Sequence, residues 1–319
     1  MIKNFLKILI LVITLFIIFI AYFSYFGIST TKFNTTIKNQ IKKQNNNLDI
    51  DLKKVKLHLD LKNISIKIKT ENPKIILNKS KKIELKEVST NILISSYLQN
   101  KFALKNISIK SKKNKLITYI EFYRLFGNPM NAILIKQFIE NGSGQINADL
   151  YFDNSGNIKN NFNLSGEVSN VDLKIDKNKI INKLNFDFRI YKKNYTFEKI
   201  FFKFNEIKFI SENIKIEQKK NKFNVKGSLK SKENKINKDI ISQIFNSNLE
   251  NLNFSNSKFK SSSEFTFDIS KKFKLKNLKI DTILDIDELI LDNKLNNLKN
   301  YIENYNNFIK LKANKFQIK

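Results

Sequence analysis

The chain has 319 residues, no cysteine, one histidine and a formal net charge of +29. The absence of cysteine excludes a disulfide scaffold and thiolate metal sites. The charge would suit a polyanionic partner. However, Lys, Asn, Ile and Phe are abundant along the whole chain while Arg, Ala and Gly are scarce, so an AT-rich genome explains the charge better than selection for anion binding.

Residues 5–26 form the most apolar stretch, and Lys7 is its only charged residue. A helix needs roughly 20 apolar residues to cross a bilayer core, and tyrosines near one end, such as Tyr22 and Tyr25, favour the headgroup region. A cleaved signal peptide is the alternative, with an apolar region of about 7–15 residues and small residues at the cut. This run is longer and ends in bulky rings, so we favour a retained anchor.

The orientation of the anchor is not decided by charge, because lysines flank both of its ends. Long domains are translocated largely regardless of charge, and a very short amino-terminal tail usually stays inside. We therefore expect residues 1–28 to form a cytoplasmic tail and anchor, with the remainder of the chain outside the cytoplasmic membrane.

Residues 29–46 are expected to contain a short amphipathic helix. Phe33, Ile37 and Ile41 recur every four residues, and lysines lie off that stripe. The helix could lie on the membrane surface or cap the first layer of the following domain, and we favour the cap.

From residue 47 to residue 319 the hydrophobic period is predominantly two, which is typical of β-strands with one apolar face. In the first run Leu57 and Leu59 alternate with lysine, His58 and Asp60. The alternation slips near Asn63, as at a bulge or turn, and then resumes. Shorter alternating runs follow at residues 75–77, 83–88, 92–94, 102–104 and 107–109.

Residues 116–141 interrupt this pattern and predict a helical insertion. Two stretches with helical spacing are separated by Gly127-Asn128-Pro129, and Gly142-Ser143-Gly144 is expected to end the insertion.

The longest β region follows the insertion. A strand over residues 146–152 leads into Asp153-Asn154-Ser155-Gly156, a strong hairpin turn, and a return strand carries Ile158, Phe162 and Leu164. Helices are expected at residues 236–249 and 295–308. Further strands are expected at residues 171–175, 184–190, 195–204, 207–209, 214–216, 223–229, 265–269, 273–275, 278–280, 283–291 and 308–318.

Such an antiparallel sheet must cover its apolar face with a second sheet, a helix, a membrane or a ligand. The expected helices are few and short. The sheet therefore either closes on itself as a sandwich or barrel, or curls into an apolar groove. From the residues alone, the closed core is the ordinary interpretation.

Catalytic chemistry has little basis in this sequence. His58 is the only histidine and lies on the polar side of its strand, where no Ser-His-acid or Cys-His pair can be assembled around it. The densest acidic cluster, Asp281, Asp285, Asp287 and Glu288, is interpreted as a surface patch rather than a cation site. No phosphate-binding loop or nucleic-acid motif is present. We therefore predict no enzyme activity, no cofactor, no metal and no nucleic-acid partner.

Three stretches resemble the AsmA-like family, the TamB and YhdP group of bacterial bridge-like lipid-transfer proteins. The likeness covers roughly residues 1–230. The stretches are the anchor leading through Lys32-Phe33-Asn34 to residues 52–68 and Asn72-Pro73-Lys74-Ile75, the insertion at residues 116–140, and Gly144–Tyr151 leading through Gly156-Asn157-Ile158 to Leu164–Val168.

The resemblance implies a mainly β protein with an inner-membrane anchor and a long curled antiparallel sheet, a β-groove, in the periplasm. Its concave face would shield acyl chains of phospholipid or another amphiphile, for phospholipid transport or outer-membrane maintenance with other envelope proteins. The candidate groove residues are Leu57, Leu59, Ile64, Ile66, Ile146, Leu150, Phe152, Phe162, Leu164, Phe186, Phe188, Phe202 and Phe204.

The chain departs from this family in length, because such proteins are usually much longer. It is expected to be a truncated or split member, a short relative, or one segment of a multi-chain bridge. The alternative function is that of a closed β-domain acting as an anchored scaffold or as a subunit of a lipopolysaccharide-export bridge.

Overall fold

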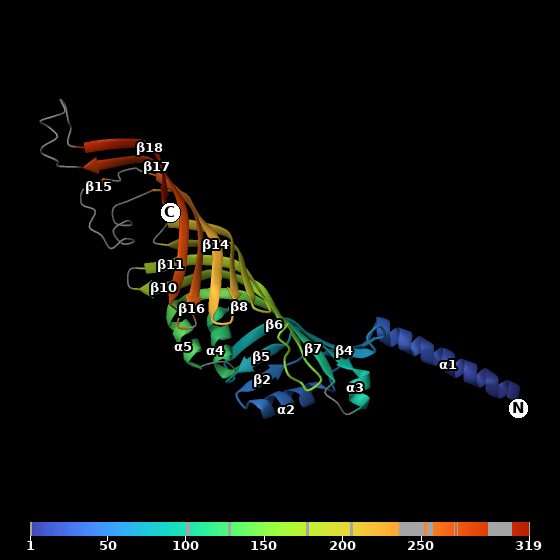
Figure 1. The fold of residues 1–319 in the computed structure, drawn as a ribbon. Coiled ribbons are helices and arrows are strands. Elements are labelled where there is room, and N and C mark those ends of the chain that lie inside the picture. Colours follow the sequence, from blue (N-terminus) through green and yellow to red (C-terminus); the bar gives the residue numbers. More distant parts are fainter. Residues whose placement is uncertain are drawn as a thin grey trace, which may run out of the picture. The chain divides into compact units, whose positions relative to one another are not determined.

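The computed structural model describes residues 2–99, 103–126, 129–176, 179–204, 207–235, 252–253, 258–270, 272, 274–292 and 308–318. The fold is mainly β and antiparallel, with an apolar amino-terminal helix and a few short helices, as the sequence predicts (Figure 1). The predicted helix at residues 236–249 lies outside the described residues, and so does that at 295–308 except for Phe308, which is the first residue of a strand.

The described helices are α1 (Ile2–Tyr25), α2 (Asn34–Gln44), α3 (Ile94–Leu98), α4 (Leu116–Phe126) and α5 (Pro129–Phe138). The described strands are β1 (Ile28–Thr30), β2 (Leu48–Asp51), β3 (Val55–Asp60), β4 (Ser65–Glu71), β5 (Lys74–Leu77), β6 (Lys81–Leu93), β7 (Leu104–Ser111), β8 (Asn114–Lys115), β9 (Ile139–Tyr151), β10 (Asn163–Asp176), β11 (Lys179–Tyr191), β12 (Asn194–Phe204), β13 (Ile207–Gln218), β14 (Lys222–Lys235), β15 (Leu252–Asn253), β16 (Lys258–Ser270), β17 (Leu275–Asp292) and β18 (Phe308–Ile318).

The chain divides into two compact units. Unit 1 comprises Met1–Gly127 with Gly144–Gly166, and unit 2 comprises Asn128–Ser143 with Glu167–Lys319.

Helix α1 begins unit 1 and is long and apolar enough to span a membrane over Phe5–Tyr25. None of its apolar stretch is buried within the protein. A helix that is apolar all round and exposed along its apolar stretch is suited to a lipid environment.

The sheet of unit 1 is built from antiparallel neighbours. Strands β1, β3, β4, β6, β7 and β9 pair in that spatial order. Strands β2 and β5 form a short branch that pairs with the first half of β6.

The core of unit 1 lies where this branch meets α2 and α4. Its buried members are Leu48, Leu77, Ile83, Leu85 and Phe122. Ile41 of α2 packs against this cluster, and Lys38 and Lys42 of the same helix form ion pairs of 3.3 and 3.5 Å with Asp49 of β2. Helix α2 therefore caps the first layer of the domain.

Unit 2 is a ladder of antiparallel strands in chain order. Strands β10 to β14 pair successively, β14 pairs with β16, and β17 then joins β16 to β18. The short β15 also pairs with β17. The sheet is not closed on itself within the described part of the chain.

Irregularities in the ladder keep apolar residues on one face. In β12 the apolar set changes from odd to even positions around Lys199, which has a positive φ of 52° and lies beside a register shift against β11. The β13–β14 and β16–β17 ladders contain equivalent shifts. One extra residue in a strand moves the side chains that follow it to the opposite face of the sheet. Each bulge therefore returns the apolar side chains to the same face when the alternation changes phase.

Several predicted boundaries need correction. The helical insertion ends at Phe138, so Gly142-Ser143-Gly144 does not end it. These three residues lie inside β9, where Gly142 has a φ of 128° that glycine readily adopts. The Asp153 turn is confirmed, since its carboxylate accepts bonds from the amides of Ser155 and Asn157. The return strand starts only at Asn163, and α3 was not predicted.

Replacing Phe122 with alanine should destabilise unit 1 by about 3–5 kcal/mol, because a buried ring is removed from the cluster with Leu85. The neighbouring Tyr123 is 43 % exposed, and its replacement with alanine should change stability by less than about 1 kcal/mol. Urea unfolding of both variants in detergent checks this. Equal losses for the two variants would show that the cluster is not the core.

Candidate functional site

The most extended feature of unit 2 is a row of side chains that runs across its strands on one face. Cross-strand pairing places one residue from each of β11, β12, β13, β14, β16 and β17 directly opposite the next. This apolar row of unit 2 consists of Phe188, Phe197, Ile214, Gly227, Phe265 and Ile280.

Neighbouring positions extend the same face with aromatic rings. Phe186 lies 5.6 Å from Phe197 between ring centroids in an edge-on arrangement, and Phe202 stacks on Phe209 at 5.3 Å. Aromatic pairs at these separations attract one another beyond the area they bury. The face is therefore held together by its own side chains.

Gly227 interrupts the row for a steric reason. A methyl group at this position would approach Ile214 Cγ1 and Phe265 Cζ to 2.9 Å. The absence of a side chain lets the flanking isoleucine and phenylalanine occupy the space above β14, so the apolar surface remains continuous across that strand.

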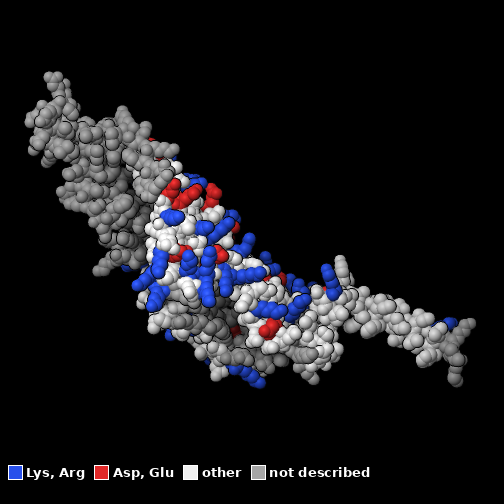
Figure 2. All heavy atoms as spheres, in the orientation of Figure 1, with Lys and Arg blue, Asp and Glu red and all other residues white. Residues whose placement is uncertain are grey.

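The opposite face has the reverse character at the adjacent positions. One residue along each strand, the paired residues are Arg189, Thr196, Lys215, Lys226, Thr266 and Lys279. Lysine and arginine side chains crowd the face of this region that Figure 2 presents. The two faces of the unit 2 sheet therefore differ sharply in polarity.

The apolar face of unit 2 is only partly covered. Phe188, Phe197, Ile214 and Phe265 are half-buried, and Ile280 at the end of the row is 44 % exposed. A sealed sandwich core would bury such residues almost completely. The face thus retains solvent-accessible apolar surface in the absence of any partner.

Unit 1 carries a similar row on its own sheet. Pairing from β1 to β9 aligns Ile28, Leu57, Ile68, Thr90, Ile107 and Leu150. A second row beside it contains Val88 and Ile109, which pack against the core with Phe122. The core therefore covers one margin of this face, while Leu57, Ile68 and Leu150 stay half-buried.

The groove residues predicted from the sequence lie in three kinds of place: on the apolar sheet faces, around the connection from β9 to β10, and in the β3–β4 turn. Those on the half-buried apolar faces are Leu57, Leu59, Ile66, Ile146 and Leu150 in unit 1 and Phe186, Phe188, Phe202 and Phe204 in unit 2. Phe152 lies at an isolated bridge with Ile158, Phe162 precedes β10, and Leu164 lies at its start. Ile64 is in the β3–β4 turn with φ 45° and is 65 % exposed.

The sequence-based set omits Phe197, Ile214, Phe265 and Ile280, which complete the row in unit 2. All four belong to alternating runs that were recognised as strands. Only the register between strands shows that they stand opposite Phe188 and one another.

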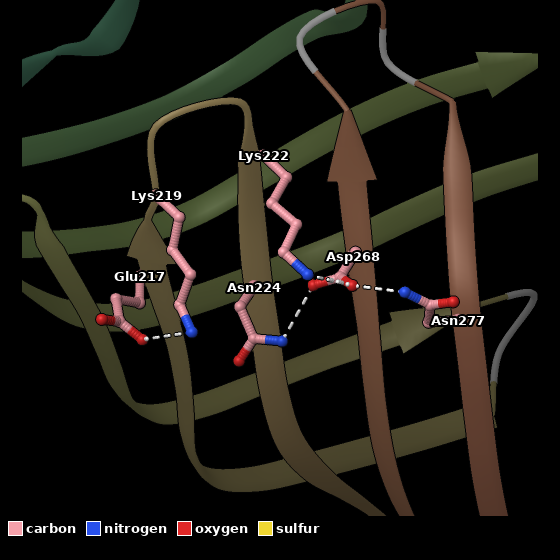
Figure 3. A network of polar contacts seen from close by, with 6 residues as sticks. All are labelled: Glu217, Lys219, Lys222, Asn224, Asp268 and Asn277. Carbon is pink, nitrogen blue, oxygen red and sulfur yellow. Dashed lines mark hydrogen bonds and ion pairs between the residues drawn. The ribbon is translucent and has the colours of Figure 1, made fainter.

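A polar network crosses the other face of unit 2 near the ends of β14, β16 and β17 (Figure 3). Asp268 is 5 % exposed and accepts bonds from Lys222 Nζ at 2.8 Å, Asn277 Nδ2 at 2.7 Å and Asn224 Nδ2 at 3.0 Å. These bonds, with that from Lys222 the strongest influence, hold the pKa of the Asp268 carboxyl well below its ordinary value. The network ties three strands together.

His58 lies on β3, and the predicted acidic surface patch lies on β17. Burial, and then the charges of Lys56, Lys67 and Lys69, lower the pKa of His58. Asp281, Asp285 and Asp287 lie exposed along β17. No group of three or more metal-ligating side chains occurs in the described part of the chain.

Comparison with known proteins identifies no relative: no protein-family model, curated protein or solved structure matches this chain. The resemblance to AsmA-like proteins therefore stays a prediction.

Asp268→Asn should lower the unfolding temperature at neutral pH because the ion pair with Lys222 is lost. Since the folded-state pKa of Asp268 lies below the unfolded one, its contribution is complete above about pH 4 and disappears as the pH falls towards the folded-state pKa. Circular dichroism melts across this range should show the two proteins converging in acid.

Glu217→Gln is the matched control, since its pair with Lys219 is looser at 3.6 Å and the Glu217 side chain is 57 % exposed. It should change the unfolding temperature little at any pH. A constant difference between Asp268→Asn and the unaltered protein down to the lowest pH would contradict the assigned role.

Proposed function

We propose that the protein is anchored in a bacterial inner membrane by α1 and shields lipid acyl chains on its apolar sheet faces in the periplasm. Its role would be phospholipid transport or maintenance of the outer membrane. The observation that carries the proposal is the half-exposed apolar row of unit 2, which crosses the strands from β11 to β17 without a charged side chain.

The apolar faces supply what an acyl chain in water lacks. Exposing a lipid tail costs about 0.8 kcal/mol per methylene, so a dozen methylenes amount to roughly 10 kcal/mol. A surface of Phe and Ile side chains recovers much of that cost without any covalent chemistry. Because the row crosses the strands, a tail lying along it would contact one side chain per strand.

The anchor supports the same proposal, because it would hold the sheet next to a source of lipid. Only two residues separate α1 from β1, the first strand of unit 1. A lipid leaving the bilayer would therefore have a short path to the first apolar row.

The alternative of a sealed β-domain that acts only as a scaffold fits the exposure less well. On β17, Leu275 and Leu278 are 55 % and 49 % exposed, and the described sheet is open. Large apolar side chains left this accessible indicate a binding surface.

A photoreactive benzoylphenylalanine at position 188 should yield phospholipid adducts when the full chain is irradiated in membranes. The side chain replaces Phe188 on the apolar face, within reach of a bound tail. Mass spectrometry of the purified protein identifies the adduct.

The same group at position 196 is the control, since Thr196 stands opposite Arg189 on the polar face. It should give no lipid adduct above background. Equal labelling at both positions, or none at position 188, would contradict the proposal.

Ile214→Glu should reduce the lipid that co-purifies with the full chain several-fold, because a carboxylate in the row makes the surface unfavourable for a tail. Lys215→Glu changes the adjacent residue on the polar face and should leave the lipid content unchanged. Both variants keep α1, so lipid bound around the anchor cancels in the comparison. Thermal melts of each verify folding, and the same lipid content in both variants would argue against binding at the row.

A further inference from the structure

Unit 1 contains a second surface suited to lipid, at the edge of its sheet where α1 enters. Strand β1 follows α1 directly and runs antiparallel to β3, with Ile28 opposite Leu57. Because the two strands are antiparallel, the end of α1, which precedes β1, lies at the same end as the part of β3 that leads from Leu57 into the β3–β4 turn. Helix α3 and the end of α1 lie at the same end of the unit (Figure 1).

The junction between helix and sheet is tight. Gly27 has a positive φ of 68°, and a methyl group there would approach the Leu57 carbonyl oxygen to 2.5 Å and the His58 ring to 2.8 Å. Ser24 of α1 lines a shared pocket with residues 58–62. The end of the helix and the end of β3 are thus held side by side.

This end of the sheet exposes large apolar side chains. In the β3–β4 turn, Leu61 and Ile64 are 55 % and 65 % exposed, and in α3 Tyr97 and Leu98 are 71 % and 75 % exposed. The Ile94 amide at the start of α3 donates to the Ile64 carbonyl at 3.2 Å, so the two segments are adjacent. Leu61 lies four residues beyond Leu57, which corresponds to about 13 Å along the strand.

A basic pocket adjoins these apolar residues. Its polar lining comprises Ser24, His58, Asp60, Lys62, Lys67 and Lys69. His58 stands directly opposite Lys67 in the β3–β4 pair.

The charges in this pocket are not balanced internally. Lys69 pairs with Glu71 and Glu87 at 3.2 and 3.0 Å, and the Asp60 carboxylate accepts bonds from the side chain and backbone amide of Asn63 and from the backbone amide of Lys62. No ion pair of Lys62 or Lys67 occurs among the described residues. Two ammonium groups are therefore available to an anion at the level where α1 ends.

We propose that the β3–β4 turn and α3 dock onto the bilayer that α1 enters, and that Lys62 and Lys67 bind the phosphate of an anionic phospholipid headgroup. Leu61, Ile64, Tyr97 and Leu98 would lie at the boundary between headgroups and acyl chains, where aromatic and aliphatic side chains beside lysines are favoured. The inference rests on the membrane anchorage in the proposed function, but not on lipid binding by the apolar rows.

Tryptophan fluorescence tests the docking, since the chain contains no tryptophan and one introduced residue is a unique probe. Leu61→Trp and Tyr97→Trp are each made in the full chain and reconstituted into phosphatidylcholine vesicles containing brominated acyl chains. Both tryptophans should lose most of their fluorescence, because bromine quenches only groups at membrane depth.

Two further positions make the result decisive. Ile13→Trp in α1 reports whether the anchor is inserted. Tyr123→Trp lies on α4, which packs near Leu85 of β6. The proposed surface adjoins the other end of β6, at Leu93, eight residues further along the strand. Position 123 is therefore distant from the proposed surface. The structure predicts quenching at position 13 and none at position 123.

The outcomes separate this inference from the proposed function. Quenching at position 13, with positions 61 and 97 as bright as position 123, would overturn the docking while leaving the anchor intact. A bright tryptophan at position 13 would overturn the anchorage itself and with it both proposals.

The headgroup contact is tested by adding phosphatidylglycerol to the vesicles, which should deepen the quenching of Leu61→Trp. The additional change Lys62→Gln with Lys67→Gln should abolish that deepening, whereas Lys53→Gln with Lys54→Gln, before the other end of β3, should not. An equal effect of both pairs would overturn the site. Inorganic phosphate added at matched ionic strength should leave the deepening unchanged; its loss would show that the pocket takes free phosphate rather than lipid.

Discussion

The rest of this structure depends on the pleat of the β-strand, which forces neighbouring side chains to opposite faces. Apolar residues share a face over many strands only if every strand keeps its register against the next. The chain meets this requirement with local irregularities, such as the one around Lys199, that reverse the facing when the alternation changes phase. Without that correction Phe202 and Phe204 would face the polar side. The open apolar faces are therefore a product of register as much as of composition.

Separating the faces leaves many like charges on one of them. Rows such as the one containing Lys215 and Lys226 place lysines directly opposite each other, which is unfavourable between neighbouring strands. Where carboxylates are present they are placed to offset this repulsion, as Asp268 does for Lys222. The polar face then remains stable while exposed to solvent and counterions, and the apolar face stays partly uncovered. This difference in polarity between its two faces lets a single sheet be hydrated on one side and apolar on the other.

The connection between α1 and the sheet is equally constrained. Gly27 adopts a left-handed conformation against the Leu57 carbonyl, where no larger residue would fit without displacing the backbone. The helix that would cross the membrane thereby passes into the first strand without a flexible linker. The end of α1 thus lies beside the β3–β4 edge, with its exposed apolar side chains and its lysines that form no ion pair within the described part of the chain.

The sequence by itself determined the local features: the apolar helix, the period of two, the Asp153 turn, and the candidate residues that alternate with lysine, such as Leu57 and Phe188. It could not decide which strand faces which, because pairing depends on contacts between residues far apart in the chain. Ile64 fits the alternation yet lies in a turn, and Phe197 and Ile280 join the unit 2 row only through pairing. Whether the apolar face is sealed or open also had to come from the tertiary structure, since burial depends on what packs above a side chain. Periodicity is a property of the strand alone, whereas register and coverage are properties of the assembled sheet.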